Sequence, residues 1–232
     1  MARKQCVLSD PGWKTIPWRL TKKTLKEILV DILVDLPTLL EDVDVMAAMT
    51  DPGTKQIQKE TLASRVWVFD KRLTDWYLSV PLPRELGMLD IEDADSMRAE
   101  DLTLAHIMTL YWCTCLVLYR TMTEVVEPDF VLPEHADSSI YCKKIIQAIP
   151  IFLHPVVGTY RVHLATFPMG LCMNYLARCD PHEMTTERAL LASYFRRPEG
   201  ATMKSFVSNI QLEALEEISS KRMMPFSQDL AT

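Results

Sequence analysis

Three polar residues lie one heptad apart in the most apolar stretch of the chain, namely His106, Cys113 and Arg120. A helix drifts by only about 20° per heptad, so their side chains share one stripe. One interpretation is packing: the imidazole hydrogen-bonds in the core, the thiol packs as a small hydrophobe, and the guanidinium pairs with an acid. The other is a polar seam beside an internal ligand cavity, where an imidazole could act as a general base near neutral pH.

A second polar set shares a helical face further along the chain. It contains His163 and Asn174, and Tyr160 precedes them by one turn. Pro168 and Gly170 would open the helix and let a ligand or another backbone approach, whereas the alternative is helix packing at a kink. Together the two sets give the catalytic candidates His106, His163 and Arg120 and the ligand-binding candidates Cys113, Tyr160 and Asn174.

Metal and cofactor motifs are missing from the sequence. The only close cysteine pair is Cys113 and Cys115, whose thiols a helix would point to opposite sides, and no second ligand lies at metal-binding spacing from His182. His135 and His154 are interpreted as surface or capping groups. Six glycines are too few for a Rossmann sheet or a phosphate-binding loop. We therefore expect no metal and no cofactor.

The charge of the chain bears on its partners and its compartment. A formal charge of −6 and a pI near 5.4 do not suit phosphate neutralisation, so we expect no direct nucleic-acid binding. The first residues contain no apolar run that resembles a signal peptide. We therefore expect a nuclear or cytoplasmic protein that is not secreted and that keeps its cysteines reduced.

Apolar periodicity predicts a series of helices that proline and turn signals separate. An N-cap assigned to Thr21 precedes the first helix, whose apolar positions recur every three or four residues, and Pro37 breaks or kinks it. Further helices are predicted over residues 38–49, 54–80, 102–124, 141–149, 156–179 (kinked at 168–170), 187–195 and 202–222, with an acid-rich connection over 89–100. No segment alternates with the period of a strand. The predicted fold is all-α, a single irregular multi-helix domain.

The predicted helical domain spans residues 21–222, between an N-terminal arm of residues 1–20 and a tail of residues 223–232. Within it, the segment Leu102–Tyr119 contains no Asp, Glu, Lys or Arg and approaches membrane-spanning length. Its threonines and histidine, and the lack of an asymmetric basic flank, favour a buried core helix. We therefore expect no membrane interaction.

Four segments, taken in order, carry a family resemblance. The first is Ile28–Asp42, which contains a Leu-Pro and a following acidic turn, and the second is the apolar Leu102–Trp112. The third is Cys142–Pro155, where a helix ends at a proline, an aromatic residue and a second proline. The fourth is Ala165–Gly170 with the following Tyr175-Leu176. From about Trp13 to Gln211 the chain resembles the fungal-specific regulatory domain found C-terminal to zinc-cluster DNA-binding motifs. The resemblance implies a helical nuclear regulator, linked to metabolic gene sets such as secondary metabolism, whose domain senses or transmits a signal.

The chain departs from that family in lacking the DNA reader. A zinc cluster of that type needs six cysteines within roughly thirty residues, so that the thiolates can share two zinc ions. Here the cysteines are spread over most of the sequence, at Cys6, Cys113, Cys115, Cys142, Cys172 and Cys179.

Three functional hypotheses remain open. The first is a regulator without its own DNA reader, which acts through a small-molecule ligand, a protein partner or a homodimer. The second is a stand-alone enzyme of fungal secondary metabolism, in which a helical cavity guides an isomerisation, epimerisation or cyclisation without metal or nucleotide. The third is a fragment that has lost an upstream zinc cluster. An enclosed pocket lined by His106, Arg120, His163 and Asn174 would separate the first two.

Overall fold

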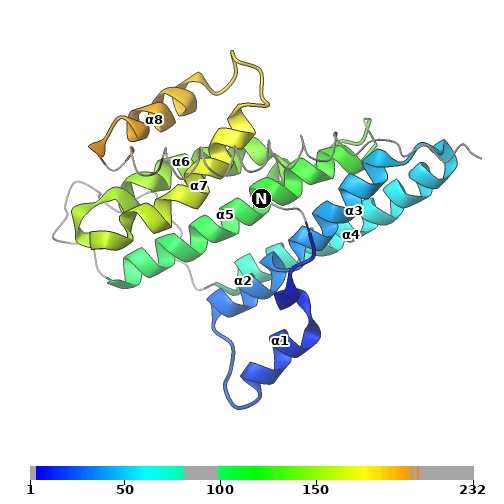
Figure 1. The fold of residues 1–232 in the computed structure, drawn as a ribbon, viewed down its shortest axis with the longest axis horizontal. Helices are drawn as coiled ribbons and strands as arrows, with labels where there is room; N and C mark the ends of the chain where they lie inside the picture. The colour runs from blue at the N-terminus through cyan, green and yellow to red at the C-terminus, as the bar shows by residue number, and fades with distance from the viewer. Residues whose placement is uncertain (1–3, 81–98, 128, 199, 201–202, 204–232) are drawn as a thin grey trace, which may run out of the picture.

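The computed structural model describes residues 4–80, 99–127, 129–198, 200 and 203. Within these ranges the chain is helical and contains no strand, which confirms the all-α prediction (Figure 1). The α-helices are α1 (Pro11–Thr15), α2 (Leu25–Leu33), α3 (Leu36–Ala48), α4 (Pro52–Ser79), α5 (Ala99–Val125), α6 (Ser138–Leu153), α7 (Arg161–Leu176) and α8 (Thr185–Phe195). The 3₁₀ helices are η1 (Val7–Ser9), η2 (Ile16–Trp18), η5 (Glu134–Ala136) and η6 (Pro155–Tyr160).

The first long helix begins at a capping box. The Thr24 hydroxyl accepts a hydrogen bond from the Glu27 backbone N–H, and the Glu27 carboxylate accepts one from the Thr24 N–H. The prediction of Thr21 as the N-cap is therefore wrong by three residues, because only Thr24 has a glutamate at the reciprocal position. The predicted effect of Pro37 is confirmed: α2 ends before it, and Pro37 lies in the first turn of α3, where no amide proton is needed.

Helix α4 begins at Pro52, because the Asp51 side chain accepts a hydrogen bond from the Thr54 N–H at 2.7 Å. Its buried face repeats every three or four residues, at Leu62, Val66, Phe69, Leu73 and Trp76. The apolar residues of the sequence predict Ile57 and Tyr77 on this face as well, but they are 68% and 40% exposed. Ile57 lies off the stripe that begins at Leu62, whereas Tyr77 lies at its edge and stacks on the ring of Tyr111, with centroids 5.3 Å apart.

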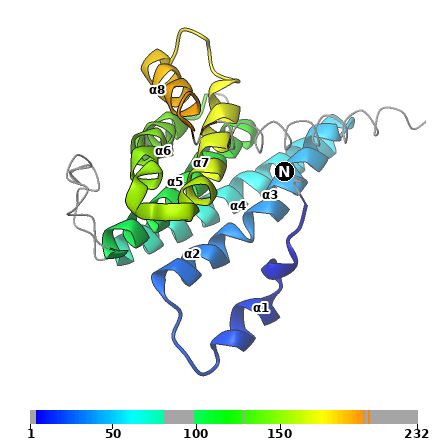
Figure 2. The ribbon, with the colours of Figure 1, turned by 60° about the vertical axis from the view of Figure 1, so that its left-hand side comes forward.

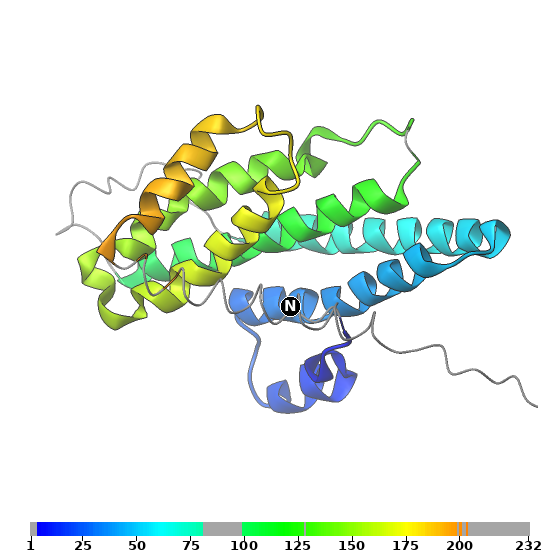
Figure 3. The ribbon, with the colours of Figure 1, turned by 45° about the horizontal axis from the view of Figure 1, so that its top comes forward.

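Helix α5 lies between the two halves of the helical body. It contacts α2, α3 and α4 as well as α6 and α7, and Figure 3 shows the blue helices α2 and α3 below it and the orange helix α8 above it. In the described part of the chain, α5 is long and apolar enough to cross a membrane, and the bent pair α6 and η6–α7 passes the same test together. However, 61% of the α5 segment is buried inside the protein, as is typical of a core helix.

Helix α6 continues past Pro150, where the sequence predicted its end, and it stops at Leu153. A proline inside a helix leaves the carbonyl four residues earlier without its usual donor. Here that carbonyl belongs to Ile146, and the hydroxyl of Tyr194 in α8 donates to it at 3.4 Å. A tertiary hydrogen bond therefore offsets part of the cost of the proline and attaches α8 to α6.

The chain turns sharply between α6 and α7. The chain direction bends by 112° between the two helical segments. His154 lies at the bend, and its Nδ1 accepts a hydrogen bond from the Val156 N–H at 3.2 Å. This contact confirms the capping role expected for His154. Gly158, with a φ of 62°, provides the left-handed backbone that the turn needs. Helix α7 then runs without a break through Pro168 and Gly170, so the bend lies before α7 and not at the predicted position.

Some predicted features lie outside the described residues. They are nearly all of the acid-rich connection at 89–100, most of the helix predicted over 202–222, and the tail of residues 223–232.

We expect Ile145→Ala to lower the free energy of unfolding by about 2–5 kcal/mol, because truncation leaves a cavity in a close-packed core. Ile145 is fully buried in α6, which packs against both α5 and α7. Urea denaturation followed by circular dichroism measures the change. Val131→Ala, at a position that is 89% exposed, is the control and should alter stability by less than about 0.5 kcal/mol. Equal effects of the two substitutions would contradict the packing described for α6.

Candidate functional site

The structure brings two of the candidate histidines together. His106 of α5 and His163 of α7 line one hollow, whose walls also include Phe152 and Phe167. The rings of His106 and Phe152 meet edge to face, with centroids 6.5 Å apart. The hollow has a volume of about 70 Å³, whereas ligand sites typically measure about 300–1,000 Å³. It has room for a few water molecules but not for a typical substrate.

The remaining candidates do not line this hollow. Arg120 follows His106 on α5 by fourteen residues, which places it about 21 Å further along the helix. Asn174 is exposed and lies eleven residues after His163 on α7, about 16 Å away. Tyr160 precedes α7 and is 68% exposed. The shared stripes are thus present in the helices, but helix length separates the residues along them.

Arg120 and Cys113 occupy different environments. The Arg120 Nε is buried and has no hydrogen-bond partner within the described part of the chain. The Cys113 side chain is 1% exposed, and burial together with the neighbouring thiols Cys115 and Cys142 raises its pKa well above the usual range. Such a thiol stays protonated, so Cys113 packs as a small hydrophobe and is not a nucleophile.

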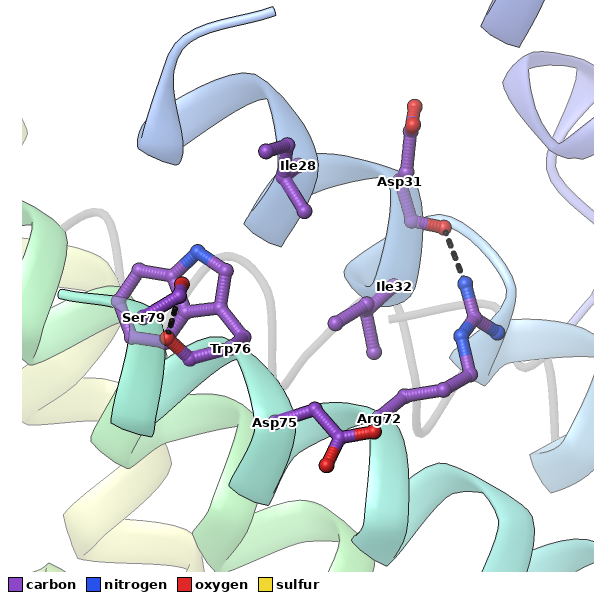
Figure 4. Close-up of a pocket in the computed structure, with 7 residues that line it drawn as sticks. All are labelled: Ile28, Asp31, Ile32, Arg72, Asp75, Trp76 and Ser79. Atoms are coloured by element: carbon purple, nitrogen blue, oxygen red, sulfur yellow. Dashed lines mark hydrogen bonds between the residues drawn. The ribbon is translucent and has the colours of Figure 1, made fainter.

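A larger hollow lies elsewhere, between α2 and α4. This α2–α4 groove has a volume of about 350 Å³, and its lining residues are Ile28, Asp31, Ile32, Arg72, Asp75, Trp76 and Ser79. Figure 4 shows the two isoleucines of α2 opposite the side chains of α4. The groove is open to solvent, and Ile28 at its edge is 40% exposed. Its volume falls within the range of ligand sites.

The apolar floor of the α2–α4 groove is held in place by Trp76. The Trp76 indole N–H donates to the Leu25 carbonyl at 2.8 Å, which joins α4 to the start of α2. The indole also stacks on the ring of Tyr111 in α5, with centroids 5.2 Å apart and 25° between the planes. The ring is therefore fixed from two sides before any ligand arrives, which lowers the entropic cost of binding against it.

The polar edge of the groove is an ion-pair network. The Arg72 guanidinium donates to the Asp35 carboxylate at 3.0 Å and to the Asp31 carbonyl at 3.5 Å (Figure 4). The Asp31 carboxylate pairs with Lys23, and Asp75 pairs with Lys71 at 2.9 Å. The groove thus offers charges of both signs beside an apolar floor, and Arg72 is the cation nearest to its interior.

A third polar feature centres on the buried carboxylate of Asp70 in α4. Its Oδ1 accepts a hydrogen bond from the Tyr119 hydroxyl at 2.9 Å and lies 3.0 Å from Nε2 of His135. The Tyr141 hydroxyl in turn donates to the His135 carbonyl at 2.7 Å. Neither hollow includes these residues in its lining. This arrangement attaches the segment before α6 to the α4–α5 interface, and it is a structural cluster.

Sequence reasoning missed both the Asp70 cluster and the α2–α4 groove. His135 is exposed, as the sequence predicted for a surface group, but its pairing with a carboxylate 65 residues away was not predicted. One signal was available: Asp70 stands directly after Phe69 within the apolar stripe of α4. The groove had no such signal, because it is formed by the packing of two helices that lie far apart in the sequence.

Comparison of the chain with family models, with curated proteins and with solved structures found no match. Among the described residues, no group of three or more histidine, cysteine or acidic side chains is arranged to hold a metal ion.

The pH dependence of stability should contain a contribution from His106. Burial lowers the pKa of His106 below its usual value of about 6.5, and the positive charge of Lys26 lowers it further. The unfolded chain then binds more protons than the folded one, so stability is lost as the pH falls below about 6.5. We expect His106→Gln, measured by urea denaturation at pH 7.5 and pH 5, to lose less stability than the wild type. A difference between the two proteins that stays constant with pH would contradict this.

Removal of one oxygen atom from the cluster of Asp70, Tyr119, His135 and Tyr141 should lower the stability of the fold. Tyr119→Phe removes the hydroxyl that donates to Asp70 and leaves the rest of a nearly fully buried ring in place. We expect a loss of about 1–3 kcal/mol in the free energy of unfolding, because a buried carboxylate then loses one of its two side-chain contacts and keeps only His135. Tyr160→Phe removes the same atom from an exposed ring and should change stability by less than about 0.5 kcal/mol. Similar losses in both variants would contradict the role of this hydrogen bond.

Proposed function

We propose that this chain is a regulatory-type binding module that takes a small-molecule ligand in the α2–α4 groove and acts without its own DNA reader. The observation that carries the proposal is the groove: about 350 Å³ of open volume beside a fixed indole and an arginine. The sequence resemblance to fungal zinc-cluster regulators supports the same class, a helical domain that senses a ligand or transmits its binding to a partner. A nuclear or cytoplasmic location fits this role.

The groove chemistry indicates what kind of ligand would fit. Ile28, Ile32 and Trp76 offer an apolar surface, and burying such area contributes roughly 25 cal/mol per Å². Arg72 offers guanidinium hydrogen bonds at one edge, which favour a carboxylate or another oxygen acceptor on the ligand. We infer an apolar small molecule, aliphatic or aromatic, that carries at least one oxygen acceptor.

The alternative, a cofactor-independent isomerase, epimerase or cyclase, has less support. The two histidines that share a hollow have about 70 Å³ beside them, and the candidate arginine lies near the other end of α5. A general base must lie within hydrogen-bond reach of the proton that it abstracts. Neither histidine lines the α2–α4 groove, so a substrate bound there would not be held against His106 or His163.

The proposed binding can be tested with one exposed residue at the edge of the groove. Ile28→Ser removes an apolar contact with the ligand, and we expect affinity to fall about tenfold, which corresponds to about 1.4 kcal/mol. Native mass spectrometry of the purified protein, incubated with an extract of its own host, identifies the retained small molecule. Titration of that molecule then measures the affinity.

The matched control is Ile57→Ser, which changes an exposed isoleucine near the other end of α4. It should bind the ligand as tightly as the wild type does. A ligand that both variants retain equally would contradict the groove as the site. A retained molecule that the wild type converts to product and His106→Gln does not would favour the enzyme instead.

A further inference from the structure

Residues 4–23, which comprise the described part of the N-terminal arm and the three residues after it, bury no side chain and are called the arm from here on. Trp18 is partly buried, but five other large apolar side chains are each at least 45% exposed, and Leu20 is 98% exposed. We call them the arm surface; they are Val7, Leu8, Trp13, Ile16 and Leu20. Single exposed apolar residues are ordinary, but five within fourteen positions form a surface that calls for a partner.

The arm is attached to the helical body by polar contacts. The Gln5 N–H donates to the Glu41 carboxylate at 2.9 Å, Lys14 pairs with Asp35, and Lys23 pairs with Asp31. Figures 1 and 2 show α1 standing off from the other helices, below α2. The five side chains of the arm surface are exposed and contribute little to holding the arm against the described part of the chain.

The arm also differs from the rest of the chain in charge. Residues 4–23 contain five basic residues and one acid, Asp10, so they carry a formal charge of +4. The basic residues are Lys4, Lys14, Arg19, Lys22 and Lys23. The whole chain carries −6. A cationic, apolar protrusion on an acidic body is complementary to a partner that is anionic at its surface and apolar beneath it.

We propose that the arm surface docks peripherally on an anionic lipid bilayer, with Trp13, Ile16 and Leu20 entering the interface and the exposed Arg19 and Lys22 side chains at the headgroups. Tryptophan and aliphatic side chains beside lysine and arginine suit this boundary, because it is apolar on one side and anionic on the other. No residue of the arm lines either of the hollows described above. A protruding surface can enter a soft bilayer directly, whereas a protein partner would need a matching cavity.

This contact is separate from the ligand groove and needs no spanning helix. It goes against the expectation from the sequence that no membrane takes part, which was argued from the apolar stretch in α5 alone. The helices within the arm are short, with three to five residues each. A docked arm would leave the core helices in place.

The test is sedimentation of the full chain with vesicles of phosphatidylserine mixed with phosphatidylcholine, compared with phosphatidylcholine alone. We expect binding to the mixed vesicles only, and weaker binding at high salt. Arg19→Gln and Lys22→Gln should each reduce the affinity about fivefold, the factor for about 1 kcal/mol per basic residue at an anionic surface. Arg178→Gln, at an exposed arginine outside the arm, should not reduce it.

The apolar part of the arm surface is tested with a matched pair of double variants. Ile16→Ser with Leu20→Ser should reduce vesicle affinity at least tenfold without changing the melting temperature, because neither side chain is buried. Ile57→Ser with Leu78→Ser removes the same residue types from exposed positions on α4 and should bind as the wild type does. Equal binding to both vesicle types, or equal loss in both double variants, would overturn the proposal. So would an arm-dependent dimer in solution that binds no vesicles.

Discussion

Helix α5 is apolar on nearly every side, and a helix of that kind can exist in water only when other helices enclose it. Its polar side chains do not relax this constraint. The hydroxyls of Thr109, Thr114 and Thr121 each donate to the carbonyl four residues earlier on α5 itself, at 2.8–2.9 Å. They therefore need no partner on a neighbouring helix. The helices α2, α3, α4, α6 and α7 all contact α5, and the fold is the arrangement that encloses it.

The Asp70 cluster is the exception to this apolar packing, and it fixes how α4 packs against α5. A carboxylate that is 9% exposed is costly to bury unless hydrogen bonds compensate for lost water. Tyr119 of α5 supplies one such bond and His135 a second contact. Only one register of α4 against α5 brings the Tyr119 hydroxyl to Asp70. The apolar stripes alone tolerate several registers, so the cluster selects among them.

The sequence predicted the helices well because their signals are local. Apolar spacing and proline positions depend on a few neighbouring residues, and Pro37 separates two helices as expected. The errors arose where a distant residue decides the outcome. Pro150 fails to end α6, and the Tyr194 hydroxyl donates to the carbonyl that Pro150 frees, which belongs to Ile146, 48 positions earlier in the chain. The bend expected near Pro168 instead lies before α7, where Gly158 allows it.

The candidate site was predicted less well, for a related reason. Heptad spacing shows which side chains share a stripe, but it does not bring them close along the helix axis. His106 and His163 share a hollow because α5 and α7 contact each other there. Arg120 belongs to the same stripe and lies about four helical turns away. The groove came from the pairing of α2 with α4, for which no residue pattern in either helix is specific.

The groove and the arm are not electrostatically independent, because they share two carboxylates. Asp35 pairs with Lys14 of the arm and with Arg72 of the groove, and Asp31 pairs with Lys23 of the arm while lining the groove. A contact that draws Lys14 away from Asp35 would strengthen the ion pair between Asp35 and Arg72. A ligand that draws Arg72 away from Asp35 would strengthen the ion pair between Asp35 and Lys14. Binding at one place must therefore change affinity at the other by the same factor. These pairs are partly exposed, so the coupling is modest, of the order of 1 kcal/mol or less per pair.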